Sequence, residues 1–172
     1  ENLLFAYKIT KDLKIKDKVI VKALNGFKGL PHRQESIFST KAGKCVNDSK
    51  ATSFDACFQS LSNYNKIYWI VGGLPKKKDQ FNLKSVSKKI TKAYIIGKTT
   101  GLFASKLKKH VSYTISNNIK NALKNIYEDI QKKGDLNYTI LLSPAAASYD
   151  QFKNFEERGD YFRKLIKKRF NV

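Results

Sequence analysis

Apolar side chains recur at three- and four-residue spacings through the first 27 residues, which is the spacing of amphipathic helices. The pattern breaks near Lys16 and Asp17, so we expect two short helices separated there. A turn at residues 28–31 follows, where Pro31 stops helix propagation and biases Leu30 towards extended geometry. The sequence thus predicts a domain boundary between residues 27 and 28.

Beyond this turn the chain alternates between strand and helix patterns. Residues 35–39 and 44–47 are expected to form a hairpin, because Lys41-Ala42-Gly43 separates them. Three short apolar runs and one weaker run predict further strands, at residues 67–71, 93–96, 138–142 and 111–115.

Amphipathic helices are expected between these strands. The clearest covers residues 117–133, whose apolar residues lie on one face. Thr52, with Asp55 three residues later, forms a capping-box pattern in front of another helix. The last helix is expected to start at Ser148, with Gln151 at its capping-box position.

Continuous apolar strands separated by amphipathic helices indicate an α/β fold with a mostly parallel sheet and helices on both faces. Sheets of this kind bind ligands at the carboxyl ends of their strands. Four polar or glycine-rich clusters fall at such ends, at residues 47–50, 72–76, 97–98 and 143–148. We therefore expect these clusters to converge at one edge of the sheet and to form a site.

The composition is that of one domain, since 172 residues with 41% hydrophobic content suffice for a single packed core. Neither a run of about 18 apolar residues nor a signal-peptide pattern occurs, so we expect a cytoplasmic chain. Cys45 and Cys57 fit neither a disulfide framework nor a metal-binding spacing, and we expect both to be buried. A start at Glu1 and the lack of methionine suggest a fragment or a processed product.

The formal net charge of +20 raises the alternative of a basic nucleic-acid-binding domain. Only four of the 34 basic residues are arginines, whereas nucleic-acid readers favour arginine for bidentate contacts. We therefore interpret most lysines as solvating the surface, and we expect no nucleic-acid partner and no membrane contact. The alternative predicts exposed aromatic residues on a basic face and binding that weakens steeply with salt.

Polar residues near the predicted strand ends are the candidates for chemistry. Asp48 offers a carboxylate to a ribose hydroxyl or a metal-bound water, and Lys50 offers a cation to a phosphate, although a solvated turn would also explain the pair. The planar guanidinium of Arg33 suits phosphate recognition or a surface ion pair. Lys76 follows a Gly-Gly turn, and Ser148 would cap a helix whose N-terminus could bind an anion.

Three other kinds of site are excluded because the sequence lacks the motifs that they require. Gly97-Lys98-Thr99-Thr100 resembles the end of a phosphate-binding loop, but Lys92 occupies the position that requires the first glycine. A dinucleotide-binding dehydrogenase would need GxGxxG after its first strand, which is absent. His32 and His110 have no second metal ligand at a helical spacing.

Four segments together resemble the Mur ligase family and follow the family's order. They are GLPHR at 29–33, NDSKAT at 47–52, Gly72-Gly73, and SPAAASYDQFKNFEERG at 143–159. The resemblance extends from about Asn2 to Arg163. NDSKAT is shared among Mur ligases, whereas the stretch at 143–159 is similar to the branch of the family that adds D-glutamate.

This resemblance implies a Rossmann-like C-terminal domain at residues 28–172, preceded by the closing helices of a central ATPase domain at residues 1–27. The implied reaction joins D-glutamate to UDP-N-acetylmuramoyl-L-alanine with ATP and Mg²⁺, through an acyl phosphate. The family's phosphate-binding loop and magnesium ligands would lie upstream. Residues 1–172 alone are therefore expected to be inactive, and the protein to be monomeric.

The resemblance also implies roles for individual residues. The positions that match nucleotide contacts are Asn2, Arg33, Asp48 and Lys50. The positions that match contacts to D-glutamate are Thr52, Lys76, Ser148, Tyr149 and Phe155. No metal ligand and no catalytic residue is expected within this chain, and the lysine run at residues 76–78 leaves the alignment of Lys76 open by a residue or two.

Overall fold

The computed structural model describes residues 2–77 and 79–170, and the side chains of residues 2 and 170 lie outside the description. The chain divides into two compact units, Glu1–Leu30 and Pro31–Val172, which are considered separately. No helix in the described part of the chain is long and apolar enough to cross a membrane.

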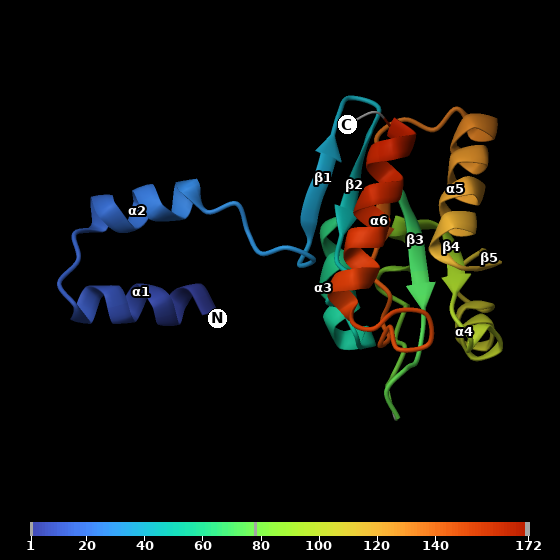
Figure 1. The fold of residues 1–172 in the computed structure, drawn as a ribbon, viewed down its shortest axis with the longest axis horizontal. Coiled ribbons are helices and arrows are strands. Elements are labelled where there is room, and N and C mark those ends of the chain that lie inside the picture. The colour runs from blue at the N-terminus through green and yellow to red at the C-terminus, as the bar shows by residue number, and fades with distance from the viewer. Residues whose placement is uncertain (1, 78, 171–172) are drawn as a thin grey trace. The chain divides into compact units, whose positions relative to one another are not determined.

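The first unit consists of two helices, α1 (Asn2–Asp12) and α2 (Asp17–Gly26) (Figure 1). An ion pair at 3.0 Å joins Lys11 Nζ to Asp17 Oδ1 across the break between them. Most of its large apolar side chains are exposed, including Leu4 at 71% and Phe5 at 69%. Within this unit the two helices therefore do not enclose a core of their own.

The second unit is built on a six-stranded sheet in the order β1-β2-β6-β3-β4-β5. The strands are β1 (Glu35–Ser39), β2 (Gly43–Asn47), β3 (Ile67–Gly72), β4 (Ile90–Ile96), β5 (Tyr113–Asn117) and β6 (Tyr138–Leu142). β1 pairs antiparallel with β2, and all other neighbours are parallel. The mostly parallel sheet expected from the sequence is confirmed.

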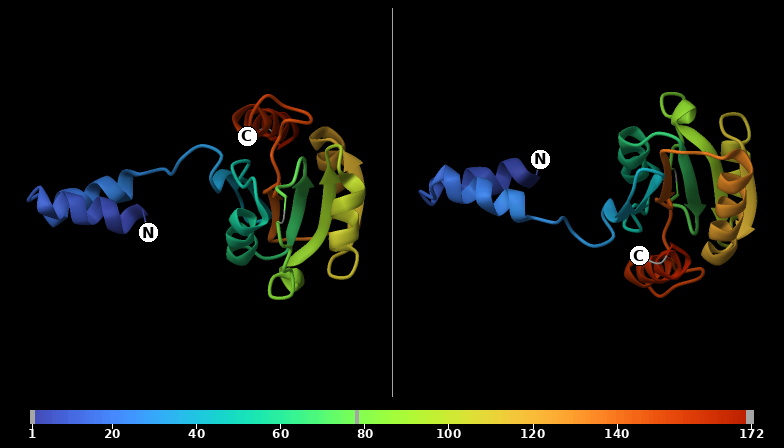
Figure 2. Two further views of the ribbon diagram at one scale, coloured as in Figure 1. Left: turned by 90° about the horizontal axis from the view of Figure 1, so that it is seen from below. Right: turned by 90° about the horizontal axis from the view of Figure 1, so that it is seen from above.

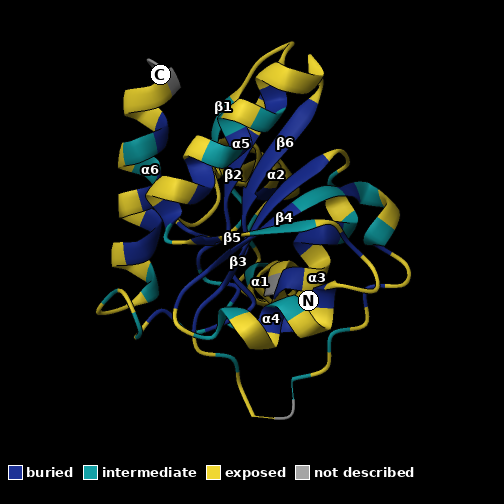
Figure 3. Cartoon of the chain, turned by 90° about the vertical axis from the view of Figure 1, so that its right-hand side faces the viewer, coloured by how far each residue is buried: buried dark blue, intermediate teal, exposed yellow. Residues whose placement is uncertain are grey.

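Helices cover both faces of this sheet (Figure 2). They are α3 (Phe54–Asn63), α4 (Thr100–Leu107), α5 (Ile119–Lys133) and α6 (Phe155–Phe170), with a short 3₁₀ helix at Ser87–Lys89. α3 and α4 share one hydrophobic cluster with the sheet, and α5 and α6 share the other. All residues of β3 and β6 are buried, because both of their faces pack against helices (Figure 3).

Several boundaries differ from the sequence-based predictions: β4 begins three residues earlier than expected and α5 two residues later. β5 begins two residues later than expected, and α3 is capped by Ser53 rather than Thr52, since Ser53 Oγ accepts the Ala56 N–H. The last helix begins at Phe155 and not at Ser148.

The observed start of α6 has a side-chain cap of its own. Asn154 Oδ1 accepts the Glu157 N–H at 2.7 Å, and Glu157 Oε2 accepts the Lys153 N–H at 2.7 Å. The carbonyl of Ser148 closes only one turn, by accepting the N–H groups of Gln151 and Phe152. The capping pattern is thus satisfied six residues further along the chain.

Candidate functional site

The carboxyl ends of β2, β6, β3 and β4 lie at one edge of the sheet, because these strands are mutually parallel neighbours. Four segments, called here the edge loops, leave the sheet at this edge: residues 47–50, 72–76, 97–99 and 143–151. The convergence expected for the four polar clusters is therefore present. Hydrogen bonds between the edge loops then fix their relative positions.

Asp48 joins three separate segments through its carboxylate. Its Oδ2 accepts hydrogen bonds from Ser60 Oγ at 2.5 Å and Ser143 Oγ at 2.8 Å, and its Oδ1 accepts the Gln34 N–H at 3.2 Å. Burial raises the pKa of Asp48 in spite of these donors, and the residue is only 6% exposed. Asp48 is therefore first of all an anchor of the edge loops.

Glycines allow the edge loops of β3, β4 and β6 to pack backbone against backbone. A Cβ atom at Gly73 (φ +131°) would collide with the carbonyl of Ala147, and one at Gly97 (φ +87°) would lie 2.9 Å from Gly73 Cα. Leu74 and Ala147 exchange two backbone hydrogen bonds of 2.9 Å, and Asp150 Oδ2 accepts the Lys98 N–H at 2.8 Å. The segment that carries Lys76 is thus tied to the segment that carries Ser148.

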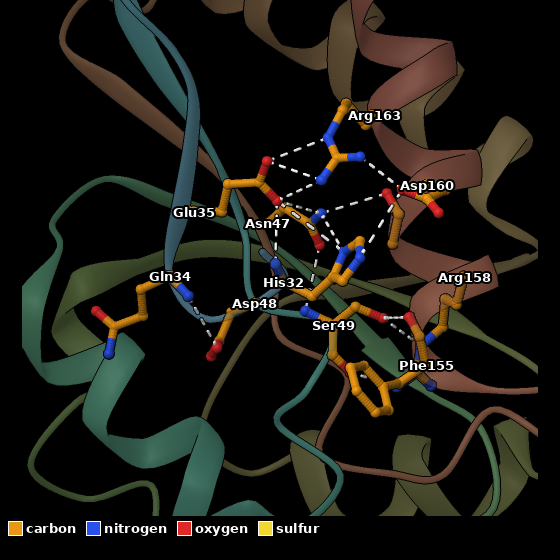
Figure 4. Close-up of polar contacts among 11 residues, drawn as sticks. His32, Gln34, Glu35, Asn47, Asp48, Ser49, Phe155, Arg158, Asp160 and Arg163 are labelled. Atoms are coloured by element: carbon orange, nitrogen blue, oxygen red, sulfur yellow. Dashed lines mark hydrogen bonds and ion pairs between the residues drawn. The ribbon is translucent and has the colours of Figure 1, made fainter. Parts of the chain in front are cut away.

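The turn that carries Arg33 is held by a second polar network (Figure 4). Asn47 Nδ2 lies 3.0 Å from His32 Nδ1 and donates to Glu35 Oε2 at 3.1 Å. Glu35 also accepts the His32 N–H at 3.0 Å, and Nη2 of Arg163 on α6 lies 2.8 Å from both of its oxygens. α6 therefore braces the turn from which Arg33 projects.

Glu35→Gln is expected to lower the melting temperature near pH 7, and to lower it less as the pH falls below 4.5. Burial opposes ionisation of Glu35, but the hydrogen bonds from Arg163 and from the His32 N–H, together with the Arg163 charge, hold its pKa below 4.5. A lowered native pKa means that ionised Glu35 stabilises the fold above pH 4.5, and this contribution is lost as the pH falls through the native pKa. Thermal unfolding of both proteins across this range tests it, and an equal difference at both ends would contradict it.

The residues expected to bind nucleotide lie in different surroundings. The side chain of Asn2 is outside the described residues. Arg33 is exposed and makes no ion pair with another described residue, so the surface ion pair considered from the sequence is not formed. Lys50 is half-buried, with Nζ 3.9 Å from the centre of the Phe155 ring. Lys50 and Phe155, which were expected to serve different ligands, are therefore in direct contact.

The residues expected to bind D-glutamate are spread over four segments. Thr52 and Phe155 are half-buried, and Lys76 and Tyr149 are exposed, Tyr149 at 72%. Ser148 is only 2% exposed, and no other described residue hydrogen-bonds its hydroxyl. The helix start expected at Ser148 is wrong, because α6 begins seven residues later at Phe155.

Sequence reasoning missed the most deeply buried charged residue at this edge. Arg158 on α6 is 1% exposed and hydrogen-bonds Ser49 Oγ, Ser49 O and Ala146 O at 3.0, 2.7 and 3.0 Å. Burial lowers its pKa to about 10. The available signal was the scarcity of arginine in a chain that otherwise uses lysine.

One hollow in the described residues lies away from the edge loops. It has a volume of about 430 Å³ and is lined by residues such as Lys44, Lys66 and Asn137, close to the points where β2, β3 and β6 begin. None of the residues expected to bind a ligand lines it. No group of three or more His, Cys, Asp or Glu side chains suited to a metal occurs in the described residues.

The chain matches no family model. It is 38% identical to the UDP-N-acetylmuramoylalanine–D-glutamate ligase of Rickettsia felis over 168 residues, which cover 98% of this chain and 37% of that protein. It is 43% identical over 148 residues to the ligase of the same name from Rhizobium meliloti, covering 86% of this chain and 32% of the relative. The chain thus spans about a third of the length of these curated relatives, in their C-terminal portion.

A solved structure has a similar fold. The crystal structure of MurF from Acinetobacter baumannii matches with a TM-score of 0.62 at 14% identity, covering 93% of this chain and 35% of that chain. At this level of identity the similarity establishes the fold alone.

Proposed function

Because the chain belongs to the Mur ligase family, we propose that it is the C-terminal part of a ligase that uses ATP to add D-glutamate to UDP-N-acetylmuramoyl-L-alanine in peptidoglycan synthesis. The observation that carries this proposal is 38% identity, across nearly the whole chain, to a ligase named for D-glutamate. Residues 28–172 would form its amino-acid-binding domain, and residues 1–27 would close the central ATPase domain. The protein would act in the cytoplasm as a monomer.

The reaction we propose has two balanced steps. The alanyl carboxylate attacks the terminal phosphorus of ATP, which gives an acyl phosphate and ADP. The amine of D-glutamate then attacks the acyl carbon, so that an amide forms and phosphate and a proton leave. Both steps require neutralised phosphate charge and an aligned amine.

Arg33 is the residue best placed to contact the terminal phosphates, since it is exposed, unpaired among the described residues and carried on a braced turn. Lys50 would provide a second cation. Asp48 already uses about three of its four acceptor positions, so a ribose hydroxyl could take no more than one. Mg²⁺ would assist phosphoryl transfer, and its ligands would come from the upstream part of the ligase.

Contacts to D-glutamate would come from the other edge loops and from α6. Lys76 would pair with the side-chain carboxylate, and the free hydroxyl of Ser148 would donate to the ligand. Phe155 and Tyr149 would border the amino acid. Thr52, which lies just before α3, would also contact it. The contact between Lys50 and Phe155 supports a shared site, because it joins the two proposed sets of residues.

Phosphate release by the complete ligase tests the proposal. With ATP and UDP-N-acetylmuramoyl-L-alanine present, D-glutamate is expected to trigger release, whereas L-lysine and diaminopimelate are not. Equal release with all three amino acids, or none with D-glutamate, would contradict the proposal. Tight binding to single-stranded nucleic acid that weakens steeply with salt would instead favour the alternative suggested by the charge.

A further inference from the structure

One buried guanidinium joins two of the edge loops that carry proposed ligand contacts. Arg158 donates from Nε and Nη2 to Ser49, which lies between Asp48 and Lys50 on the nucleotide side. It donates from Nη1 to the carbonyl of Ala146, two residues before Ser148 on the amino-acid side. Figure 4 shows this side chain reaching from α6 to Ser49.

The three acceptors of Arg158 are all uncharged. No described carboxylate lies within ion-pair distance of its guanidinium, and the charge of Asp150 acts on it only from further away. An apolar side chain of similar length would fill the same space without the cost of desolvating a cation. Lysine carries a compact ammonium that does not span three acceptors in two loops. The guanidinium therefore serves to fix the position of Ser49 relative to Ala146.

The same turn of α6 reinforces this connection. The carbonyl of Phe155 accepts a hydrogen bond of 2.8 Å from Ser49 Oγ, and its ring lies 3.9 Å from Lys50 Nζ. Ser49 thus uses its hydroxyl for both Phe155 and Arg158. A shift of Arg158 would move the nucleotide-side loop and the amino-acid-side loop at once.

We propose that Arg158 is a positioning residue that sets the distance between the nucleotide and D-glutamate subsites, an inference that rests on the proposed function. It touches neither ligand and acts through Ser49 and Ala146. Loss of Arg158 therefore weakens the binding of both the nucleotide and D-glutamate, whereas loss of a direct ligand contact weakens the binding of only one of them.

Steady-state kinetics of the complete ligase test this with Arg158→Lys, Arg158→Met and Ser49→Ala. The KM values for ATP and for D-glutamate are both expected to rise in Arg158→Lys and in Arg158→Met, each about tenfold, while kcat per folded enzyme changes less. Ser49→Ala, which keeps two of the three hydrogen bonds, shifts both KM values in the same direction but less. Arg169→Met on the same helix is the matched control, since Arg169 stacks on Tyr127 and contacts no edge loop in the described residues.

The outcomes separate positioning from stability. If Arg158→Lys and Ser49→Ala only reduce the folded fraction, measured by thermal unfolding, and leave both KM values unchanged, Arg158 is structural and the inference is wrong. A shift in a single KM also overturns it. A wild-type ligase that releases no phosphate with D-glutamate overturns the proposed function, and this inference with it, whatever the variants do.

Discussion

Gly159→Ala is expected to lower the free energy of unfolding by about 3 kcal/mol. Gly159 lies inside α6, where alanine normally stabilises a helix by up to about 1 kcal/mol. A Cβ atom at this position would instead collide with Nδ1 of His32 and lie 2.9 Å from its Cε1. His32 is 6% exposed and its ring is held by Asn47, so it has no free space into which to turn.

Chemical denaturation of wild type and variant measures this effect. Gly101→Ala in α4 is the matched control, because a Cβ atom there meets nothing within 4 Å, and it is expected to be neutral or slightly stabilising. Equal effects of the two substitutions would show that the His32 ring yields easily. The network around the Arg33 turn would then be looser than its hydrogen bonds indicate.

Lys76→Ala in the complete ligase is expected to raise the KM for D-glutamate ten- to hundredfold and to leave the KM for ATP within about twofold. A hydrogen bond to a charged group contributes about 1.5–3 kcal/mol, which corresponds to that range. Lys76 is exposed, and its segment is fixed by the pairing of Leu74 with Ala147 next to Ser148. Its ammonium therefore remains available to a carboxylate.

Lys77→Ala is the matched control for this prediction, because Lys77 is the exposed neighbour in the same lysine run. It is expected to change neither KM. If Lys77→Ala shifts the KM for D-glutamate and Lys76→Ala does not, the role belongs one residue further along. If neither substitution shifts it, no lysine at these two positions holds the amino acid.

Much of the fold follows from the periodicity of the sequence. β3 and β6 are continuous apolar runs because both of their faces are buried, and α5 shows a clean apolar stripe with Asn118 capping its start and Gly134 its end. Because parallel strands end at the same edge of a sheet, the polar clusters that follow the strands were expected to lie together at that edge. The structure places them there.

The start of α6 was not predictable in the same way. Ser148 and Asn154 both begin capping patterns, with Gln151 and Glu157 three residues later, so the local signals conflict. The segment between them packs against other edge loops, as the bond from the Lys98 N–H to Asp150 shows. Tertiary contacts decided the boundary.

The polar interior of the site was also hidden from the sequence. Nothing in the spacing of Asp48, Ser60 and Ser143 indicates that one carboxylate accepts from both hydroxyls, since the residues are far apart in the chain. The three neutral acceptors of Arg158 are likewise brought together only by the fold. Such partners are set by topology, which local patterns do not encode.

The uneven use of the two basic residue types makes this chain suited to chemical footprinting. A dicarbonyl reagent modifies guanidinium groups and spares ammonium groups, so among 34 basic residues only the four arginines would react. Arg158 is buried, and Arg163 forms ion pairs with two carboxylates. Arg33 and Arg169 are therefore the accessible targets. The extent of modification of Arg169 can therefore serve as an internal standard. Protection of Arg33 by ADP is measured as a fall in its modification relative to that of Arg169.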